Sequence, residues 1–188
     1  MIKIVVDNRE KQPWSFGEFA EVTHGTLRTG DYAVQFQDPF GLWQTDQGFA
    51  IERKSMDDFL GTISSDWGRF QREIRRAVEA GFVLLIVVEG CTTDFLYHYS
   101  VAGMDVVQAD MWKLVKAIED YLGTELPKNL VAPINSHPNI GGAFVLKRIT
   151  DIFNLGGFVV FADNALHASI LAFSFLRDRF KLLNPDEP

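Results

Sequence analysis

The sequence has almost no cysteine, no long apolar run and no excess of positive charge. Its single cysteine, Cys91, excludes an intrachain disulfide and, since no ligand-spaced Cys or His lies near it, a zinc finger. No apolar run reaches the roughly 20 residues of a transmembrane helix. Residues 1–7 are typical of a strand that ends in an acid rather than of a signal peptide. We therefore expect an intracellular protein that does not contact a membrane.

The charge balance is acidic, with a formal net charge of −7 at pH 7. This balance argues against a protein that binds nucleic acid by bulk charge. Arginine nevertheless recurs at helical spacing within residues 66–80, at Arg69, Arg72, Arg75 and Arg76. Such a row is usually a solvated helix face. Contact with backbone phosphates, which would position DNA without reading its sequence, is the alternative, and the pattern leaves both open.

Apolar and aromatic residues are plentiful, at 47% and 13% of the chain. They suffice for one well-packed core, so we expect a single domain over residues 1–188. Unbroken apolar runs predict strands buried on both faces, and apolar positions three and four apart predict helices. The predicted strands are residues 2–6, 19–27, 32–36, 48–53, 82–88 and 158–161. The predicted helices are residues 56–63, 66–80, 104–122, 140–154 and 164–181.

This order of elements predicts an α/β sandwich with one mixed central sheet flanked by helices. The first strands are expected to form an antiparallel meander. That arrangement would bring Asp31 and residues 52–54 to the same end of the sheet. Residues 100–135 are interpreted as an added helical and loop segment, which could serve as a lid, a dimer contact or a DNA guide. A helical turn is also expected at residues 92–98.

The candidate site is built on Gly30-Asp31 and, about twenty residues later, Glu52-Arg53-Lys54. Alternate side chains of a strand share a face, so Glu52 and Lys54 should project together while Arg53 projects the other way. Two carboxylates suit Mg²⁺ or Mn²⁺, which can polarise a phosphodiester and lower the pKa of a bound water. Lys54 could orient or deprotonate that water, or stabilise transition-state charge, and the sequence does not choose among these roles.

Four motifs together resemble the nuclease domain of the XPF/Mus-type (ERCC4-domain) structure-specific endonucleases, in the restriction-endonuclease-like superfamily. The family signature is G-D, a variable gap, then E-R-K-x-x-x-D. Gly30, Asp31, Glu52, Arg53, Lys54 and Asp58 fill it without a mismatch. Asp7, Arg9 and Glu10 match a D-x-R-E after the first strand, and Arg69, Phe70 and Glu73 match an R-F-x-x-E helix.

The resemblance implies a Mg²⁺- or Mn²⁺-dependent DNA endonuclease that acts on branched or otherwise structured DNA, in repair or recombination. It also implies a homodimer or heterodimer formed through this domain. Metal ligation is implied for Asp31 and Glu52 with Asp7 and Glu10 close by, catalytic support for Lys54 and Arg53, and phosphate handling for Arg9 and Arg53. Arg69, Arg72 and Arg76 are the further DNA-binding candidates, and Asp58 is a supporting residue.

Other interpretations stay open at this point. Asp7 and Glu10 could be ordinary turn acids that support the site, and Asp58 could be an acid in the first turn of a helix, where the dipole favours it. The domain could also be a catalytically silent DNA-binding or scaffold partner. A resolvase or restriction-type nuclease of the same fold is a third reading.

Overall fold

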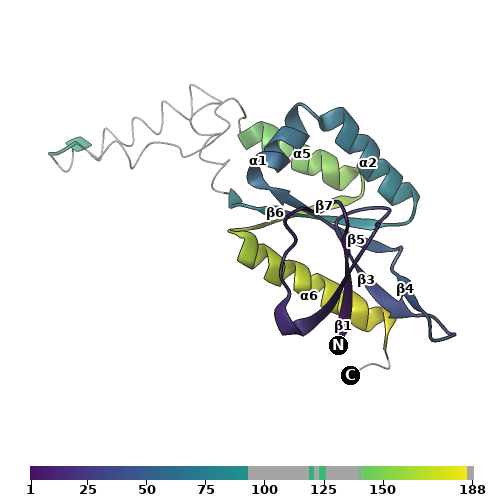
Figure 1. The fold of residues 1–188 in the computed structure, drawn as a ribbon. Coiled ribbons are helices and arrows are strands. Elements are labelled where there is room, and N and C mark those ends of the chain that lie inside the picture. The colour runs from purple at the N-terminus through teal and green to yellow at the C-terminus, as the bar shows by residue number, and fades with distance from the viewer. Residues whose placement is uncertain (93–118, 121–122, 126–139, 141, 186–188) are drawn as a thin grey trace.

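A computed structural model describes residues 1–92, 119–120, 123–125, 140 and 142–185 (Figure 1). The expected helical turn at residues 92–98 and most of the expected helix at 104–122 lie outside these residues. The greater part of the expected added segment at 100–135 does as well. Among the described residues, no helix is both long enough and apolar enough to cross a membrane.

The described residues form a seven-stranded mixed sheet with strand order β2-β1-β3-β5-β6-β7, and β4 pairs with β3. The strands are β1 (Ile2–Asp7), β2 (Ala20–Gly25), β3 (Tyr32–Gln37), β4 (Trp43–Thr45), β5 (Phe49–Ser55), β6 (Val83–Glu89) and β7 (Gly157–Ala162). The helices are the 3₁₀ turn η1 (Gly17–Phe19), α1 (Met56–Ser64), α2 (Trp67–Glu79), α5 (Gly142–Asn154) and α6 (Ala165–Leu183).

The sheet departs from the expected meander at its first edge. β3 is antiparallel to β5, as predicted, but β2 pairs with β1 in parallel, and β3 pairs with β1 instead of with β2. The meander prediction was therefore wrong for β2. The segment between β1 and β2 includes η1 and returns the chain to the starting end of β1, which is what a parallel pairing requires. The three-residue strand β4 was also not predicted.

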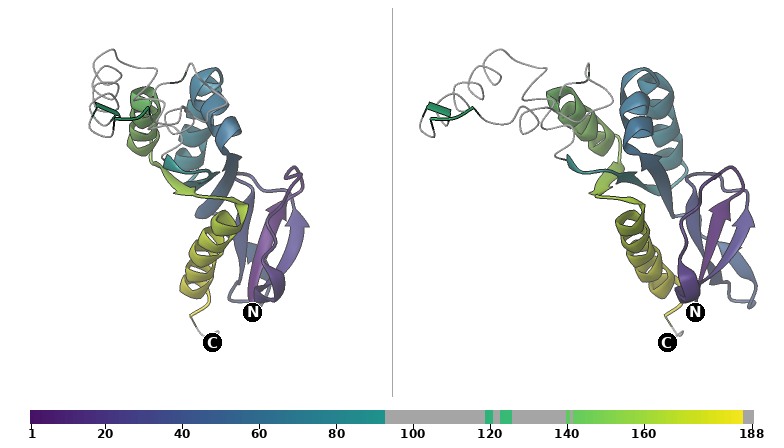
Figure 2. Two further views of the ribbon diagram at one scale, coloured as in Figure 1. Left: turned by 90° about the vertical axis from the view of Figure 1, so that its left-hand side faces the viewer. Right: turned by 60° about the vertical axis from the view of Figure 1, so that its left-hand side comes forward.

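Helices cover both faces of the sheet and form a three-layer α/β sandwich (Figures 1 and 2). On one face, Ala168, Ala172 and Leu176 of α6 pack with Leu85 and Val87 of β6 in a single buried cluster. The opposite face of β6 packs into a second cluster with α1, α2 and α5. The alternation along β6 explains its unbroken apolar sequence, because both of its faces are buried.

The pairing of β3 with β5 brings the two halves of the candidate site together, as predicted. Tyr32 and Ile51 are paired, and the Asp31 N–H donates to the Ile51 carbonyl at 2.7 Å. Gly30 makes this approach possible. Its φ of +71° lies in the left-handed region, and a Cβ there would lie 2.7 Å from the Ile51 carbonyl oxygen. Glycine at this position is therefore a structural requirement of the site.

Candidate active site

Glu52 and Lys54 leave β5 on the same face, and Arg53 leaves it on the other, as the strand alternation predicted. Lys54 Nζ lies 2.8 Å from Glu52 Oε1, and both side chains are largely buried. Their face is the one that α1 and α2 cover, because neighbouring Ala50 belongs to that buried cluster. Ile51, which precedes Arg53 by two residues, belongs to the cluster on the α6 face. The acid and the amine therefore project together beside the helices.

Asp31 reaches the same place from β3. Its Oδ2 accepts a hydrogen bond from the Arg53 N–H at 2.8 Å, so the backbone of β5 fixes the carboxylate. Burial, and then the nearby charge of Glu52, raise the pKa of Asp31 to about 7. Two carboxylates placed close together are costly to ionise at the same time, and a divalent cation bound by both would remove that cost.

Lys54 keeps its proton in this setting. Burial alone would lower the pKa of its ammonium, but Glu52, Asp31 and Asp58 outweigh that effect, so the net shift is upward. An ammonium that holds its proton more tightly than usual is a donor and a source of positive charge. It is poorly suited to act as a base.

Asp7 and Glu10 have protein donors as partners. The Asp7 carboxylate accepts four hydrogen bonds, from the Arg9 N–H at 2.8 Å, Arg9 Nε at 2.7 Å, Arg9 Nη2 at 3.0 Å and the Leu27 N–H at 2.7 Å. Burial raises the pKa of Asp7, but these donors outweigh it and lower the pKa overall. Glu10 Oε1 accepts from the Gln12 N–H at 2.6 Å and from Arg53 Nη1 at 3.3 Å.

The described residues contain no group of three or more Asp, Glu, His or Cys side chains that could hold a metal ion. The candidate ligands are thus the pair Asp31 and Glu52. Mg²⁺ usually keeps several waters and takes only one or two protein carboxylates, so a pair fits this ion. Asp31 Oδ1 accepts no hydrogen bond from any described residue, which leaves it available as a ligand atom.

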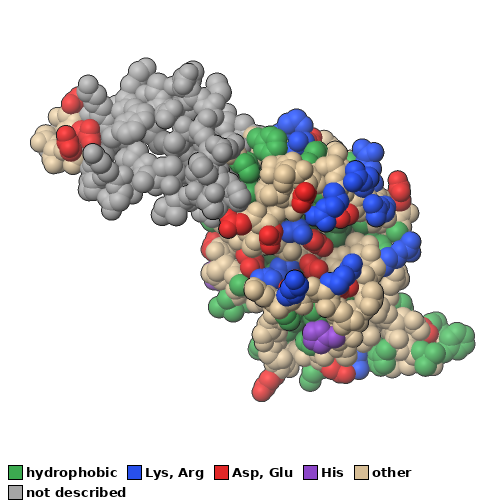
Figure 3. All heavy atoms as spheres, turned by 45° about the horizontal axis from the view of Figure 1, so that its top comes forward, with side chains coloured by type: hydrophobic (Ala, Val, Ile, Leu, Met, Phe, Trp, Pro, Cys, Tyr) green, Lys and Arg blue, Asp and Glu red, His purple; other side chains and the backbone are tan. Residues whose placement is uncertain are grey.

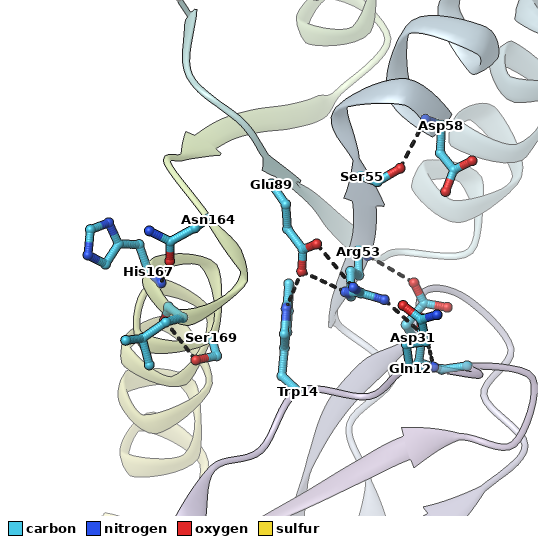
Figure 4. A network of polar contacts seen from close by, with 12 residues as sticks. Gln12, Trp14, Asp31, Arg53, Ser55, Asp58, Glu89, Asn164, His167 and Ser169 are labelled. Carbon is cyan, nitrogen blue, oxygen red and sulfur yellow. Dashed lines mark hydrogen bonds and ion pairs between the residues drawn. The ribbon is translucent and has the colours of Figure 1, made fainter. Parts of the chain in front are cut away.

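Arg53 forms a largely buried network on the face opposite to Glu52 (Figure 4). Its Nε and Nη2 donate to the two oxygens of Glu89 at 2.8 and 3.0 Å, and Trp14 Nε1 donates to Glu89 Oε1 at 2.6 Å. Burial lowers the pKa of Arg53, but Glu89 outweighs it and the net shift is upward. The sequence analysis missed Glu89 and Trp14, although an acid that ends a buried strand beside the site was a usable signal.

Two hollows open on either side of the carboxylate pair. One, of about 410 Å³, reaches towards α2 and is lined by Arg9, Arg28, Thr29, Gly30, Asp31, Glu52, Lys54, Arg69, Glu73 and Arg76. The other, of about 400 Å³, reaches towards residues 9–12 and the start of α1, where it is lined by Asp58. Figure 3 shows Lys and Arg side chains gathered on one face of the molecule, around and between Asp and Glu side chains.

The predicted helix that carries the row of arginines is present as α2, but only two of its four arginines line the hollow at the candidate site. Arg69 and Arg76 line the hollow, whereas Arg72 and Arg75 do not. Arg28 of the β2–β3 loop, which the sequence analysis did not single out, also lines it. Asp58 lies in the first turn of α1, where its N–H donates to the capping Ser55 hydroxyl at 3.1 Å.

The family comparison agrees with the motifs. The ERCC4 domain matches residues 6–121, which is more than half of the chain. The chain belongs to the ERCC4-domain family. The matched range contains Asp31, Glu52 and Lys54, which the structure brings together at the end of β5.

Solved structures show the same fold for this ERCC4-domain chain. XPF from Aeropyrum pernix matches with a TM-score of 0.52 and 14% identity, covering 94% of this chain and 64% of that one. The structure of the same protein described as a complex with DNA matches with a TM-score of 0.55 and 15% identity, over 97% and 66%. This chain therefore spans slightly less than two thirds of the length of each. The fold is the restriction-endonuclease-like one. A search of curated proteins finds no match.

Proposed function

We propose that this chain is a metal-dependent DNA endonuclease that hydrolyses phosphodiester bonds. The observation that carries the proposal is the convergence of Asp31, Glu52 and Lys54 in a hollow at the end of β5. Membership of the ERCC4-domain family supports it, as does the likeness in fold to a protein whose structure is described as a complex with DNA. By the resemblance in its motifs, the substrate is branched or otherwise structured DNA.

Asp31 and Glu52 would hold Mg²⁺ or Mn²⁺. When bound, the cation supplies a polarised phosphate and a water of lowered pKa. The chain supplies the geometry, because the Arg53 N–H fixes one oxygen of Asp31 and leaves the other free. Lys54 remains an ammonium and serves as a donor to negative charge that develops on the phosphate. Lys54 Nζ lies 2.8 Å from Glu52 Oε1, beside the proposed cation, where an ammonium can donate to the phosphate.

Arg53, Asp7 and Glu10 act through other residues. Arg53 is a positioning residue, because both edges of its guanidinium are occupied by acids on the far face of β5. Asp7 fixes the turn at Arg9 and the start of the 27–31 loop. Glu10 anchors Arg53 and the turn at Gln12. In this assignment none of these three contacts the cation.

Oligomerisation through the domain, which the motif resemblance implies, is part of the same proposal. α6 carries exposed apolar side chains, including Leu166, Ile170 and Leu182, that a second subunit could cover. The mass in solution, measured by light scattering after size exclusion, tests this part separately from catalysis.

A substrate panel tests the central proposal. The purified protein is mixed with single-stranded, duplex, nicked, flap, forked and four-way DNAs in Mg²⁺, Mn²⁺ or EDTA. Cleavage is expected in either metal and none in EDTA. Glu52→Gln and Lys54→Ala should each lower the rate by about 100-fold or more, the scale of losing an electrostatic or acid–base group.

The matched control is Glu79→Gln, an exposed acid of α2 that lines neither hollow. This variant should cut like the wild type. Cleavage that survives unchanged in Glu52→Gln would place the active site elsewhere. DNA binding without cleavage in any metal would identify the domain as a catalytically silent partner. Cutting of four-way junctions in preference to forks and flaps would favour a resolvase.

A further inference from the structure

The hollow beside α2 is lined by more cationic than acidic side chains. Five cationic side chains line it, against three acidic ones: Arg9, Arg28, Lys54, Arg69 and Arg76 against Asp31, Glu52 and Glu73. An excess of positive charge of this kind attracts an anionic ligand. The question is which of these cations are available to a ligand.

Three of the five already have acidic partners. Arg9 Nε lies 2.7 Å from Asp7 Oδ1, and Lys54 contacts Glu52. Arg69 lies 3.4 Å from Asp66 and 3.6 Å from Glu73. Neither Arg28 nor Arg76 has a hydrogen-bond or ion-pair partner among the described residues.

The two arginines without partners come from different elements of the fold. Arg28 lies in the loop that joins β2 to β3, three residues before Asp31. Arg76 lies in the last turn of α2, whose inner face is fixed by buried Phe70, Ile74 and Ala77. Both arginines line the same hollow as the carboxylate pair Asp31 and Glu52.

We propose that Arg28 and Arg76 bind the DNA backbone phosphate next to the scissile one, and so hold the strand in this hollow. The inference rests on the proposed function for its ligand. A guanidinium presents a planar fork that matches two phosphate oxygens, which suits it to this contact. The volume of about 410 Å³ falls in the range of hollows that take a small ligand.

The two hollows beside the carboxylate pair differ in their number of cations without partners. The hollow on the other side of the carboxylates is lined by only one further cation without a partner among the described residues, Lys11. Arg53, which also lines it, is bound to Glu89. The strand is therefore gripped more strongly on the α2 side of the scissile bond than on the side of residues 9–12.

The chain offers matched controls on the same helix. Arg72 and Arg75 are exposed arginines of α2 that do not line the hollow. We would compare Arg28→Ala and Arg76→Ala with Arg72→Ala and Arg75→Ala. The probe is a fluorescein-labelled forked DNA, and binding is measured in the Glu52→Gln background so that no strand is cut.

Loss of Arg28 or Arg76 should weaken binding by about tenfold, as expected for a charge-assisted hydrogen bond. The double variant Arg28→Ala/Arg76→Ala should reduce the slope of log K against log salt by roughly 0.7 to 0.9, the contribution of the one phosphate that both arginines contact. Arg72→Ala and Arg75→Ala should change neither quantity appreciably. All four variants should melt like the wild type, because none of these side chains is buried.

A neutral phosphate analogue locates the contact. Each phosphate near the cleavage position is replaced in turn by a methylphosphonate, and every substituted DNA is bound by the wild type and by each variant. At one position adjacent to the scissile bond, the losses from the substitution and from Arg28→Ala should fail to add, because both remove the same contact. Arg76→Ala should show the same coupling at that position.

The outcomes separate this inference from the proposed function. The inference alone would be overturned if the wild type cleaves DNA but Arg28→Ala and Arg76→Ala bind it like Arg75→Ala. It would also be overturned if the affinity losses from the arginine and methylphosphonate substitutions add at every phosphate. Absence of cleavage in any metal, with the coupling still present at one phosphate, would overturn the proposed function and leave the phosphate site standing.

Discussion

Replacing Asp7 with alanine should destabilise the fold without removing a metal ligand. The Asp7 side chain is 1% exposed, and it accepts from two backbone N–H groups and two guanidinium nitrogens. The Leu27 N–H, on a residue that is itself buried, would lose its partner at a cost of about 1–3 kcal/mol. The ion pair adds less, because the Arg9 side chain is 71% exposed.

Together with the Arg9 N–H, these losses come to about 3 kcal/mol. For a domain of this size such a change lowers Tm by about 6–12 °C. The same carboxylate makes stability depend on pH. Since the pKa of Asp7 is lowered in the folded state, its contribution is present above the unfolded value of about 3.9. The contribution is lost as pH falls through the lower folded value.

The assay is thermal melting of wild type, Asp7→Ala and Asp7→Asn from neutral to acidic pH, combined with Mn²⁺ titration at a temperature where all are folded. Asp178→Ala is the control, since that acid is exposed and, within the part of the chain that the structure describes, its carboxylate pairs with its neighbour Arg177 alone. The stability gap for Asp7→Asn should narrow below about pH 4. An Asp7→Ala protein that melts like the wild type but no longer binds Mn²⁺ would refute the reasoning and make Asp7 a ligand.

Three further predictions concern the walls of the site. Gly30→Ala should lower the free energy of unfolding by about 2 kcal/mol or more, because of its left-handed backbone and the contact with the Ile51 carbonyl. Gly61→Ala in α1, where a Cβ meets open space, should raise the free energy of unfolding by about 0.5–1 kcal/mol, and chemical denaturation measures both changes. Arg53→Ala and Glu89→Ala should each lower the free energy of unfolding. The loss in the double variant should be smaller than the sum of the two single losses by about 1–3 kcal/mol, because the two side chains are only 15% and 13% exposed. Losses that add would show that the two residues are not coupled. Asp31→Asn should abolish Mn²⁺ binding measured by calorimetry. In EDTA the same variant should be more stable than the wild type, by a difference in unfolding free energy that grows from about pH 4 and levels off above about pH 7. A variant less stable than the wild type at pH 8 would contradict burial and the charge of Glu52 as the cause of the raised pKa of Asp31.

The predictable part of the fold was the part that periodicity determines. β6 reads as an unbroken apolar run because α6 covers one of its faces and α1, α2 and α5 cover the other. β2 was found as a strand, but its partner and direction were not, because the loop at residues 8–19 carries no signal for where the chain returns. β4 is a three-residue strand after a turn and is too short to show alternation.

The site divides along the same line. Alternation placed Glu52 and Lys54 together and Arg53 opposite, which needs only the two-residue period of a strand. The same alternation placed Arg53 on the other face, where Glu89 and Glu10 accept hydrogen bonds from its guanidinium, although its side chain still lines the hollow beside residues 9–12. Glu89 could not be found in this way, since its importance comes from the pairing of β5 with β6, and Arg28 lies in a loop, where no alternation marks it.

Local charge explains how an acidic chain could accept a polyanion. Many acids here are already paired with a cation, as Asp46 is with Arg179, and such pairs contribute little field at a distance. The hollow by α2 is the reverse case, because two of its guanidiniums have no partner among the described residues and could contact a short stretch of DNA backbone. Binding should therefore depend on a small number of phosphates near the scissile bond, because the net charge of −7 repels DNA elsewhere. It follows that affinity should rise sharply when a divalent cation neutralises Asp31 and Glu52, and that the rise should be lost in Asp31→Asn.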